Sequence, residues 1–310
     1  MPREVTVRIL GSGGAVPSKD RWVSGVLVVD WMGNRVLLDA GEGVQMRLQE
    51  AGYSTSSIDV VAVTHEHGDH VNGLAGLLQS MYVNDRTRPL KIIAPKPVLD
   101  FIDEVLEATE TRLGFPIAKI EALGNGSTTL SEAGGYRLGI HWFPTCHSKS
   151  SMGYKLTWTL RPKINIEALE SIGVKPGPWV RELLEKGAVD VEGKIVRISQ
   201  VGQPQRSASI VYTGDTAPCM EVIEASRGAE VLIHDSTYSS DMTSEAVSRG
   251  HSTARAAAFI AKEAGVGLLV LTHISSRYRG GEALKLLREA RSVFPNTILA
   301  WDHARMILRF

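Results

Sequence analysis

The chain has 310 residues, of which 43% are hydrophobic and 22% charged, with 30 Gly and 13 Pro. This composition is typical of a soluble globular protein with a sizeable core, and it excludes disordered, collagen-like and disulfide-scaffold chains. Lys and Arg total 34, as do Asp and Glu, so a polyanionic partner must be held by a local patch or by a metal ion. Two cysteines, a charged N-terminal strand pattern and the lack of a membrane-length apolar run predict a cytoplasmic protein.

Short apolar runs alternate with segments of helical period along the chain. The early strand patterns follow one another closely, and the later ones are separated by helix patterns, which predicts two sheets with helices outside them. Strands are predicted at residues 5–10, 26–30, 35–39, 59–63, 90–94, 136–143, 154–158, 208–212, 230–234 and 267–271, and helices at residues 44–51, 72–81, 98–107, 253–264 and 282–293.

The pattern changes from residue 160 to about residue 205. Two short amphipathic helix patterns stand there, interrupted by Pro and Gly, and the charges are mixed in sign. By composition alone this stretch is typical of a surface subdomain with no function of its own.

The most informative motif is THEHGDH at residues 64–70, directly after the apolar strand at 59–63. In extended backbone, residues two apart point the same way, so His65 and His67 converge on one point while Asp69 and His70 face a neighbouring one. Gly68 allows the tight turn between the two pairs. Three imidazoles and a carboxylate form a donor set that suits zinc. The alternative is a polar loop whose histidines form local hydrogen bonds.

Further ligands must come from distant parts of the chain. Asp215 and His273 each lie just beyond an apolar strand, and His147 follows one by a few residues. Taken singly, each is more often an ordinary capping or satisfied polar residue, but one aspartate can bridge two cations about 3.5–4 Å apart. Cys146, beside His147, has two interpretations, a buried thiol or a soft ligand next to the metal.

This arrangement resembles the metallo-β-lactamase superfamily, in which the motif His-x-His-x-Asp-His is followed by distant His, Asp and His. Several longer blocks resemble more specifically the ribonuclease Z family of tRNA 3′-processing endonucleases, and the last two blocks are the most discriminating. The resemblance implies an α/β fold, the four-layer αβ/βα sandwich of the superfamily. The blocks are LGSGGAVPS at residues 10–18, LDAGEGVQ at 38–45, HGDHVNGLAGLL at 67–78, SMGY at 151–154, GHST at 250–253 and LTHISSRY at 271–278.

The resemblance implies two Zn²⁺ ions per subunit and precursor tRNA as the substrate. Two such ions lower the pKa of a bridging water to about 7 and stabilise charge on the phosphoryl oxygens. Asp69 is then placed both to bind a metal and to orient the hydroxide, and the products are a tRNA 3′-hydroxyl and a trailer with a 5′-phosphate. The implied ligands are His65, His67 and His147 for one zinc, Asp69, His70 and His273 for the other, and Asp215 as the bridge.

A proton donor for the leaving ribose oxygen is the remaining requirement. His251 precedes an alanine-rich helix pattern, and on the residues alone it is equally well the residue before a helix N-cap at Ser252 or Thr253. The resemblance implies that His251 is the donor and that Asp235 keeps it protonated. Many relatives carry Glu in the block of Asp235, and Asp is shorter by one methylene.

The resemblance also divides the chain into a catalytic domain, residues 1–159 and 206–310, and a protruding inserted arm, residues 160–205, that grips the tRNA away from the cleavage site. Gly177 and Pro178 match a Gly-Pro element near the tip of the family's arm, and Trp179 is equally explained as a buried anchor of the arm. Relatives form homodimers in which one subunit's arm serves the other's active site. The basic residues expected to contact phosphates are Arg161, Lys163, Lys175, Arg181 and Lys186.

Three functions remain open from the sequence. The first is a zinc-dependent endonuclease that removes the 3′ trailer of precursor tRNA. The second is another hydrolase of the superfamily that acts on a small phosphodiester, thioester or lactone, although such enzymes generally lack the arm and the His-Ser-Thr block. The third is an RNA-binding module with a dead metal site, which the complete ligand set argues against.

Overall fold

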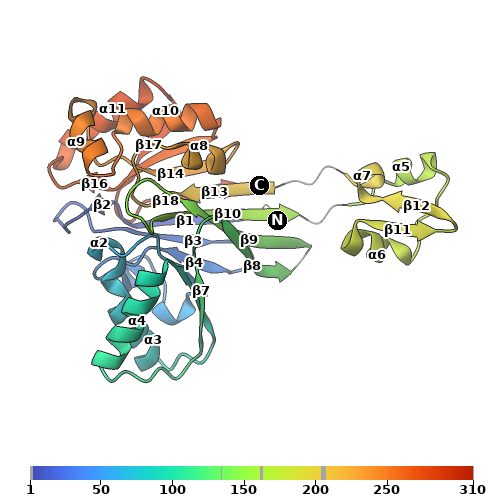
Figure 1. The fold of residues 1–310 in the computed structure, drawn as a ribbon, viewed down its shortest axis with the longest axis horizontal. Coiled ribbons are helices and arrows are strands. Elements are labelled where there is room, and N and C mark those ends of the chain that lie inside the picture. The colour runs from blue at the N-terminus through green and yellow to red at the C-terminus, as the bar shows by residue number, and fades with distance from the viewer. Residues whose placement is uncertain (1–2, 134, 161–162, 204–206, 310) are drawn as a thin grey trace. The chain divides into compact units, whose positions relative to one another are not determined.

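The computed structural model of the protein describes residues 3–133, 135–160, 163–203 and 207–309, so the predicted phosphate contact at Arg161 lies outside the described residues. Within these ranges the chain forms two large mixed sheets that stack face to face, with helices on both outer faces (Figure 1). The predicted arrangement of two sheets with helices outside is confirmed: the fold is the four-layer αβ/βα sandwich. No helix among the described residues is long and apolar enough to cross a bilayer.

The first sheet contains seven described strands in the order β18-β1-β3-β4-β5-β6-β7. The β1, β3 and β4 strands are antiparallel neighbours, and β4, β5, β6 and β7 run parallel. Helices α1, α3 and α4 cover the outer face of this sheet with a buried aliphatic cluster. The bounds are β1 Glu4–Gly11, β3 Gly25–Val29, β4 Arg35–Leu38, β5 Val60–Ala62, β6 Leu90–Ala94, β7 Ile117–Glu121, β18 Arg305–Arg309, α1 Val44–Glu50, α2 Gly68–Val71, α3 Gly73–Val83 and α4 Lys96–Ala108.

The second sheet contains seven described strands in the order β17-β15-β14-β13-β10-β9-β8. The β13, β14 and β15 strands are parallel neighbours, and Ile210 pairs with Val231, which in turn pairs with Leu268. The bounds are β8 Gly126–Ala133, β9 Tyr136–Pro144, β10 Met152–Leu160, β13 Ser207–Tyr212, β14 Val231–Asp235, β15 Leu268–Thr272, β17 Thr297–Leu299, α8 Met220–Ser226, α9 Thr243–Ser248, α10 Ala254–Ala264 and α11 Leu284–Arg291; two short strands, β2 Gly13–Gly14 and β16 Ile274–Ser275, pair separately.

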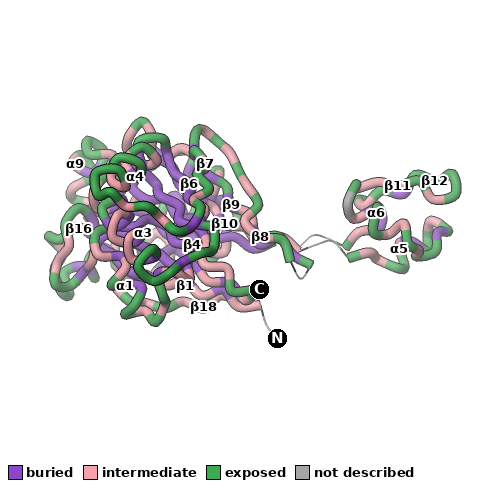
Figure 2. The backbone as a smooth tube through the Cα atoms, turned by 90° about the horizontal axis from the view of Figure 1, so that it is seen from below, coloured by how far each residue is buried: buried purple, intermediate pink, exposed green. Residues whose placement is uncertain are grey.

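Alanine spacing explains how α10 covers the second sheet. Ala254, Ala257, Ala258 and Ala261 are all fully buried and repeat at helical spacing, so they form one face of the helix. Their small side chains let the helix backbone approach β14 and β15 closely. Thr253 caps the helix by accepting a hydrogen bond from the Ala256 backbone N–H at 3.1 Å. Figure 2 shows the buried residues gathered in the strands and on the inward faces of the helices.

The four described strands at the edges of the two sheets are absent from the sequence-based prediction. Strands β7, β8, β17 and β18 were not predicted, and β7 and β8 carry many exposed or half-exposed residues without a clear apolar alternation. The helix predicted at residues 282–293 begins instead as a 3₁₀ turn, Gly280–Ala283, and continues as α11. Edge strands are held by backbone pairing to a neighbour, which a hydrophobic pattern does not reveal.

A second compact unit comprises residues Thr129–Gly139 and Thr157–Ala208. It contains the stretch predicted as an inserted arm at residues 160–205. It also contains parts of the strands β8, β9 and β10 of the second sheet. The unit has its own small core, in which Leu169, Leu183 and Val201 are fully buried and Trp179 packs against them. Its elements are α5 Ile166–Ser171, α6 Trp179–Lys186, β11 Ala188–Val191, β12 Lys194–Arg197 and α7 Ile198–Val201.

Candidate metal centre

The parallel strands of both sheets place polar loops at their carboxyl ends, which is where open α/β sheets bind ligands. Asp215 follows β13, Asp235 is the last residue of β14, and His273 follows β15. The motif THEHGDH follows β5 in the other sheet, and its second half forms the short helix α2. The stacking of the sheets brings these loops together.

The structure gathers all seven predicted ligand residues into two adjoining groups. Within each group, the ligand atoms lie within 4.8 Å of one another. The first group is His65, His67, His147 and Asp215, and the second group is Asp69, His70, Asp215 and His273.

Asp215 belongs to both groups and gives one carboxylate oxygen to each. Its Oδ2 lies 3.7 Å from the Nε2 atoms of His65 and His147. Its Oδ1 lies 3.2 Å from His70 Nε2 and 3.1 Å from His273 Nε2. A carboxylate shared in this way is the arrangement that a pair of cations requires from a bridging ligand.

The hydrogen bonds of the histidines show that this donor set fits metal ions. Three buried atoms that face the centre, His65 Nε2, His70 Nε2 and Asp215 Oδ1, have no hydrogen-bond partner among the described residues. On the far side of its ring, His70 Nδ1 donates to Asp39 at 2.7 Å, and His147 Nδ1 donates to the Gly250 carbonyl at 2.9 Å. These contacts leave Nε2 as the lone-pair nitrogen, as zinc-binding histidines require.

Asp39 is a functional residue that the sequence interpretation missed. It is fully buried at the end of β4 and accepts hydrogen bonds from His70 Nδ1, the Thr64 backbone N–H and the Tyr212 hydroxyl, each at 2.7 Å. It therefore fixes the ring orientation of one candidate ligand and the start of the histidine motif. Its block, LDAGEGVQ, was visible in the sequence, but no ligand role follows from that pattern alone.

Positive charge on histidines balances the carboxylates of the centre. Burial alone would lower the pKa of His70, but Asp215 and Asp39 outweigh it and hold that pKa well above its usual value. Burial alone would raise the pKa of Asp215, but His273 and His70 hold it well below its usual value. The buried carboxylates are therefore stabilised by positive charge close to them. Bound cations can supply this charge in place of the protons on the histidines.

Asp235 and His251 form a second charged pair beside the centre. His251 Nδ1 donates to Asp235 Oδ2 at 2.8 Å, so the shorter side chain of Asp still reaches the histidine. Burial would lower the pKa of His251, but Asp235 outweighs it and raises the pKa to about 9. Thr237, which the sequence interpretation missed, donates its hydroxyl to Asp235 Oδ1 at 2.6 Å and accepts from His273 Nδ1 at 2.8 Å. It links the charged pair to a candidate ligand.

A loop near the N-terminus supports Asp69. The backbone N–H of Ala15, whose φ is 63°, donates to Asp69 Oδ2 at 2.7 Å. Asp302 holds both ends of this loop, because it accepts from the Ser12 backbone N–H at 2.9 Å and from the Trp22 backbone N–H at 2.6 Å. The position of Asp69 therefore depends on a residue near the other end of the chain.

Cys146 is exposed, so the interpretation as a buried thiol was wrong. Its Sγ does not join either histidine group. It lies instead with Cys219 Sγ and the carboxylate of Glu221, all within 4.8 Å of one another. Although the residue is exposed, partial desolvation of its sulfur, followed by the hydrogen bond and charge of Cys219, raises the pKa of Cys146 to about 12.

The predicted tRNA-contact residues all lie in the second compact unit. Lys175, Pro178, Arg181 and Lys186 are exposed and Gly177 is half-exposed. Lys186 forms an ion pair with Glu182 at 2.8 Å. Gly177 and Pro178 immediately precede α6.

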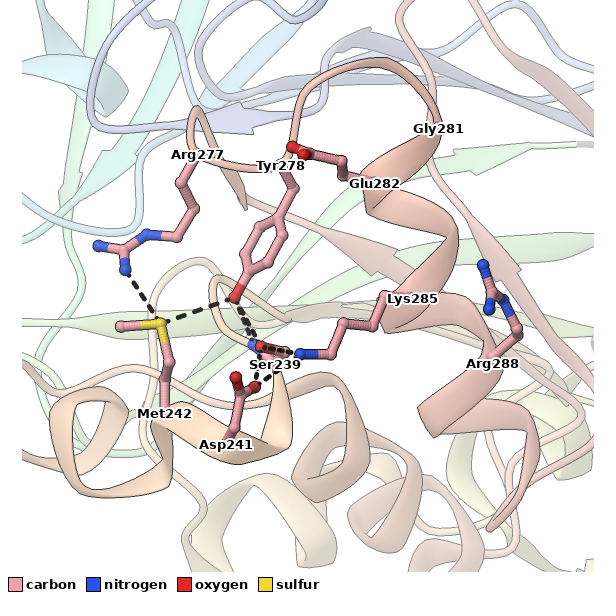
Figure 3. Close-up of a pocket in the computed structure, with 9 residues that line it drawn as sticks. All are labelled: Ser239, Asp241, Met242, Arg277, Tyr278, Gly281, Glu282, Lys285 and Arg288. Carbon is pink, nitrogen blue, oxygen red and sulfur yellow. Dashed lines mark hydrogen bonds and ion pairs between the residues drawn. The ribbon is translucent and has the colours of Figure 1, made fainter.

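A pocket of about 420 Å³ lies between the segment that follows β14 and the start of α11 (Figure 3). The Arg277 guanidinium stacks over the Tyr238 ring at 5.1 Å, and that ring lies 6.0 Å from the His251 ring. Lys285 and Arg288 extend from α11 into the same pocket. The pocket lining is Ser239, Asp241, Met242, Arg277, Tyr278, Gly281, Glu282, Lys285 and Arg288.

Known proteins resemble this chain over nearly its whole length. A ribonuclease Z from Aeropyrum pernix is 51% identical over 97% of this chain and 98% of the relative, and a ribonuclease Z from Methanosarcina mazei is 39% identical over 94% of both. Residues 5–164 match the family model of the anti-Pycsar protein Apyc1, and residues 197–274 match that of a beta-lactamase superfamily domain.

Solved structures share the fold. The human tRNase Z, short form, has a TM-score of 0.68 and 24% identity, over 97% of this chain and 98% of that chain. The metallo-beta-lactamase fold protein YhfI from Bacillus subtilis has a TM-score of 0.69 and 21% identity, over 99% of this chain and 100% of that chain.

Proposed function

This chain belongs to the ribonuclease Z family and is a metal-dependent tRNA 3′ endonuclease, and on that premise we propose that it uses two Zn²⁺ ions to remove the 3′ trailer of precursor tRNA. The products are a tRNA with a 3′-hydroxyl and a trailer with a 5′-phosphate. The observation that carries the proposal is the shared carboxylate of Asp215, whose two oxygens face two separate sets of ligands.

The donor set supports zinc. Five of the seven ligand residues are histidines, whose nitrogens suit Zn²⁺, and Zn²⁺ also accepts the two carboxylates, whereas Mg²⁺ and Ca²⁺ prefer oxygen alone. We assign His65, His67 and His147 to one ion and Asp69, His70 and His273 to the other. Bound by these residues, the two ions would lower the pKa of a water ligand and would stabilise negative charge on the phosphoryl oxygens.

The residues of the chain supply the remaining chemistry. Asp69 is held in place by the Ala15 N–H and His273, so it can orient an attacking water as well as bind metal. His251 is protonated because Asp235 accepts from its Nδ1, and its Nε2–H is then available to protonate the leaving 3′-oxygen. A buried carboxylate that holds a histidine protonated is the arrangement a general acid requires.

Binding of RNA requires local positive charge, because the chain as a whole has none in excess. Arg277, whose guanidinium stacks over the Tyr238 ring near His251, supplies part of it, together with Arg288 in the same pocket. Lys285 lines that pocket too, but it is ion-paired with Asp241 at 2.9 Å. The unit at residues 157–208 supplies more, and we propose that its Lys175, Gly177, Pro178, Arg181 and Lys186 contact the body of the tRNA. We also propose a homodimer, as the family implies, which sedimentation of the purified protein tests.

Cleavage of a labelled tRNA precursor, with the product ends mapped, tests this function. The expected product is a tRNA with a 3′-hydroxyl at the trailer junction, formed only without chelator and restored by Zn²⁺. The matched control is Asp215→Asn, which keeps the shape of the side chain but removes the bridging charge. Zinc content of the purified protein, measured in parallel, should be two per chain.

The second candidate is a hydrolase of small phosphodiesters, because the two ligand groups by themselves do not distinguish RNA from a small ester. Parallel assays on bis(p-nitrophenyl) phosphate and on precursor tRNA distinguish the two. Both enzymes can hydrolyse the small ester, but only the endonuclease cuts precursor tRNA. Turnover of the small ester with an intact tRNA precursor would overturn the endonuclease proposal. Protein purified without metal would instead favour an RNA-binding module.

A further inference from the structure

The two cysteines of the chain lie side by side next to the metal centre. Cys146 stands two residues after β9, and Cys219 is the residue before α8. Their Sγ atoms lie within 4.8 Å of each other. Since the sequence holds no other cysteine, each thiol has one partner within its own chain.

Hydrogen bonds already join the two segments that carry these thiols. The Cys146 backbone N–H donates to Thr216 Oγ1 at 3.1 Å, and the Ala217 backbone N–H donates to the Cys146 carbonyl at 2.9 Å. One step further in, Thr145 Oγ1 donates to the Asp215 carbonyl at 3.3 Å. A disulfide forms only where the backbone brings two thiols together. The bonded segments hold the two Sγ atoms within 4.8 Å of each other, so a small shift of the side chains is enough for the bond to form.

Each of these segments also carries a residue of the metal centre. His147 directly follows Cys146, and Asp215 lies in the segment that leads to Cys219. We propose that Cys146 and Cys219 form a disulfide that fastens these two segments together, so that the centre keeps its shape and holds its metal more tightly. This proposal can be tested without tRNA, because both the cross-link and the release of metal are measured on the protein alone.

Exposure sets the order of the chemistry. Cys146 is exposed and Cys219 is only partly exposed, so a small disulfide such as oxidised glutathione reaches Cys146 first. Because the pKa of Cys146 is raised to about 12, this step is slow at neutral pH and is run in alkaline buffer. There the Cys146 thiolate attacks one glutathione sulfur and releases the other as a thiolate. The Cys219 thiolate then attacks the mixed disulfide and releases the second glutathione. Two protein S–H bonds are lost, one S–S bond forms, and two electrons and two protons end on two molecules of reduced glutathione.

A soft cation bound by the two thiols is the competing explanation. Glu221 supplies a third donor within the same 4.8 Å, and the group contains no fourth donor. Structural zinc sites are normally closed by four protein ligands and are shielded from water. An exposed set of three donors therefore favours a bond between the thiols over a bound ion.

Oxidation of the zinc-loaded full-length protein by glutathione disulfide tests the proposal. We expect peptide mapping to recover Cys146 linked to Cys219 in the monomer, with both free thiols lost. Release of zinc to EDTA should be about tenfold slower than from the reduced protein. The melting temperature of the chelated protein should rise by about 5–10 °C on oxidation, because the cross-link closes a long loop of the unfolded chain.

The Cys219→Ser variant is the matched control, since it keeps Cys146 but removes its partner. After the same oxidation it should release zinc as fast as the reduced wild type. The proposal is overturned if the wild type keeps both thiols, or forms only glutathione adducts or intermolecular bonds. It is also overturned if the cross-link forms without slowing zinc release, or if Cys219→Ser lowers the zinc content from three per chain to two, which would identify a cation site.

Discussion

Replacement of Asp235 by Asn tests whether one carboxylate keeps His251 protonated. Asp235 accepts four hydrogen bonds, from His251 Nδ1, the Thr216 backbone N–H, and both the backbone N–H and the hydroxyl of Thr237. An amide has one oxygen and one NH₂ group, so in either orientation its NH₂ faces a donor. The variant therefore loses the negative charge beside His251 and at least one hydrogen bond at this position.

The size of the effect follows from the pKa of His251. Asp235 overcomes the opposing effect of burial and raises this pKa to about 9, from an ordinary value of 6.5. If the variant returns to the ordinary value, the protonated fraction at pH 7.5 falls from about 97% to about 9%, which lowers turnover about tenfold. At pH 6 both proteins are mostly protonated, and the difference shrinks to less than about twofold.

Single-turnover cleavage of a labelled precursor tRNA, measured between about pH 5.5 and pH 9, reports this difference. Asp235→Glu is the matched control, because it keeps the charge and should retain a profile close to that of the wild type. Zinc content is measured for each variant. If Asp235→Asn lost activity by the same factor at every pH, Asp235 would be a structural residue and the general-acid pair would be refuted.

Four other changes have defined outcomes. His251→Ala should lower turnover by roughly 10²–10⁴-fold while zinc content and tRNA affinity stay nearly unchanged, and an equal loss of binding would contradict its role. Leu183→Ala in the arm core should destabilise that unit by about 2–5 kcal/mol and weaken tRNA binding in a filter assay, without slowing hydrolysis of bis(p-nitrophenyl) phosphate. Asp302→Asn presents an NH₂ group to the Ser12 or Trp22 N–H, so it should loosen the loop that supports Asp69 and lower kcat more than it raises KM. Chelation should abolish cleavage but leave tRNA binding measurable by gel shift.

The sequence predicted the parts of the site that follow from local geometry. The motif THEHGDH needs only an apolar strand before it for its side chains to converge, and the structure shows that strand as β5. Asp215 and His273 were predicted because each follows an apolar run, and parallel strands end at one edge of a sheet. The structure shows that these side chains come together, and their role as metal ligands stays a prediction.

The supporting residues were decided by the tertiary structure. Asp39 stands at the end of β4 among many polar residues. The pairing of β4 with β5 brings His70 to its carboxylate, and the stacking of the two sheets brings the Tyr212 hydroxyl to it. The contact of Ala15 uses a backbone N–H, which every residue except proline carries, so no sequence pattern can identify it. Cys146 and Cys219 likewise became neighbours only in the fold, where an isolated β-bridge joins Cys146 to Ala217. The sequence determines which chemical groups are present, but the distances between groups that are remote in the sequence are set only when the chain folds.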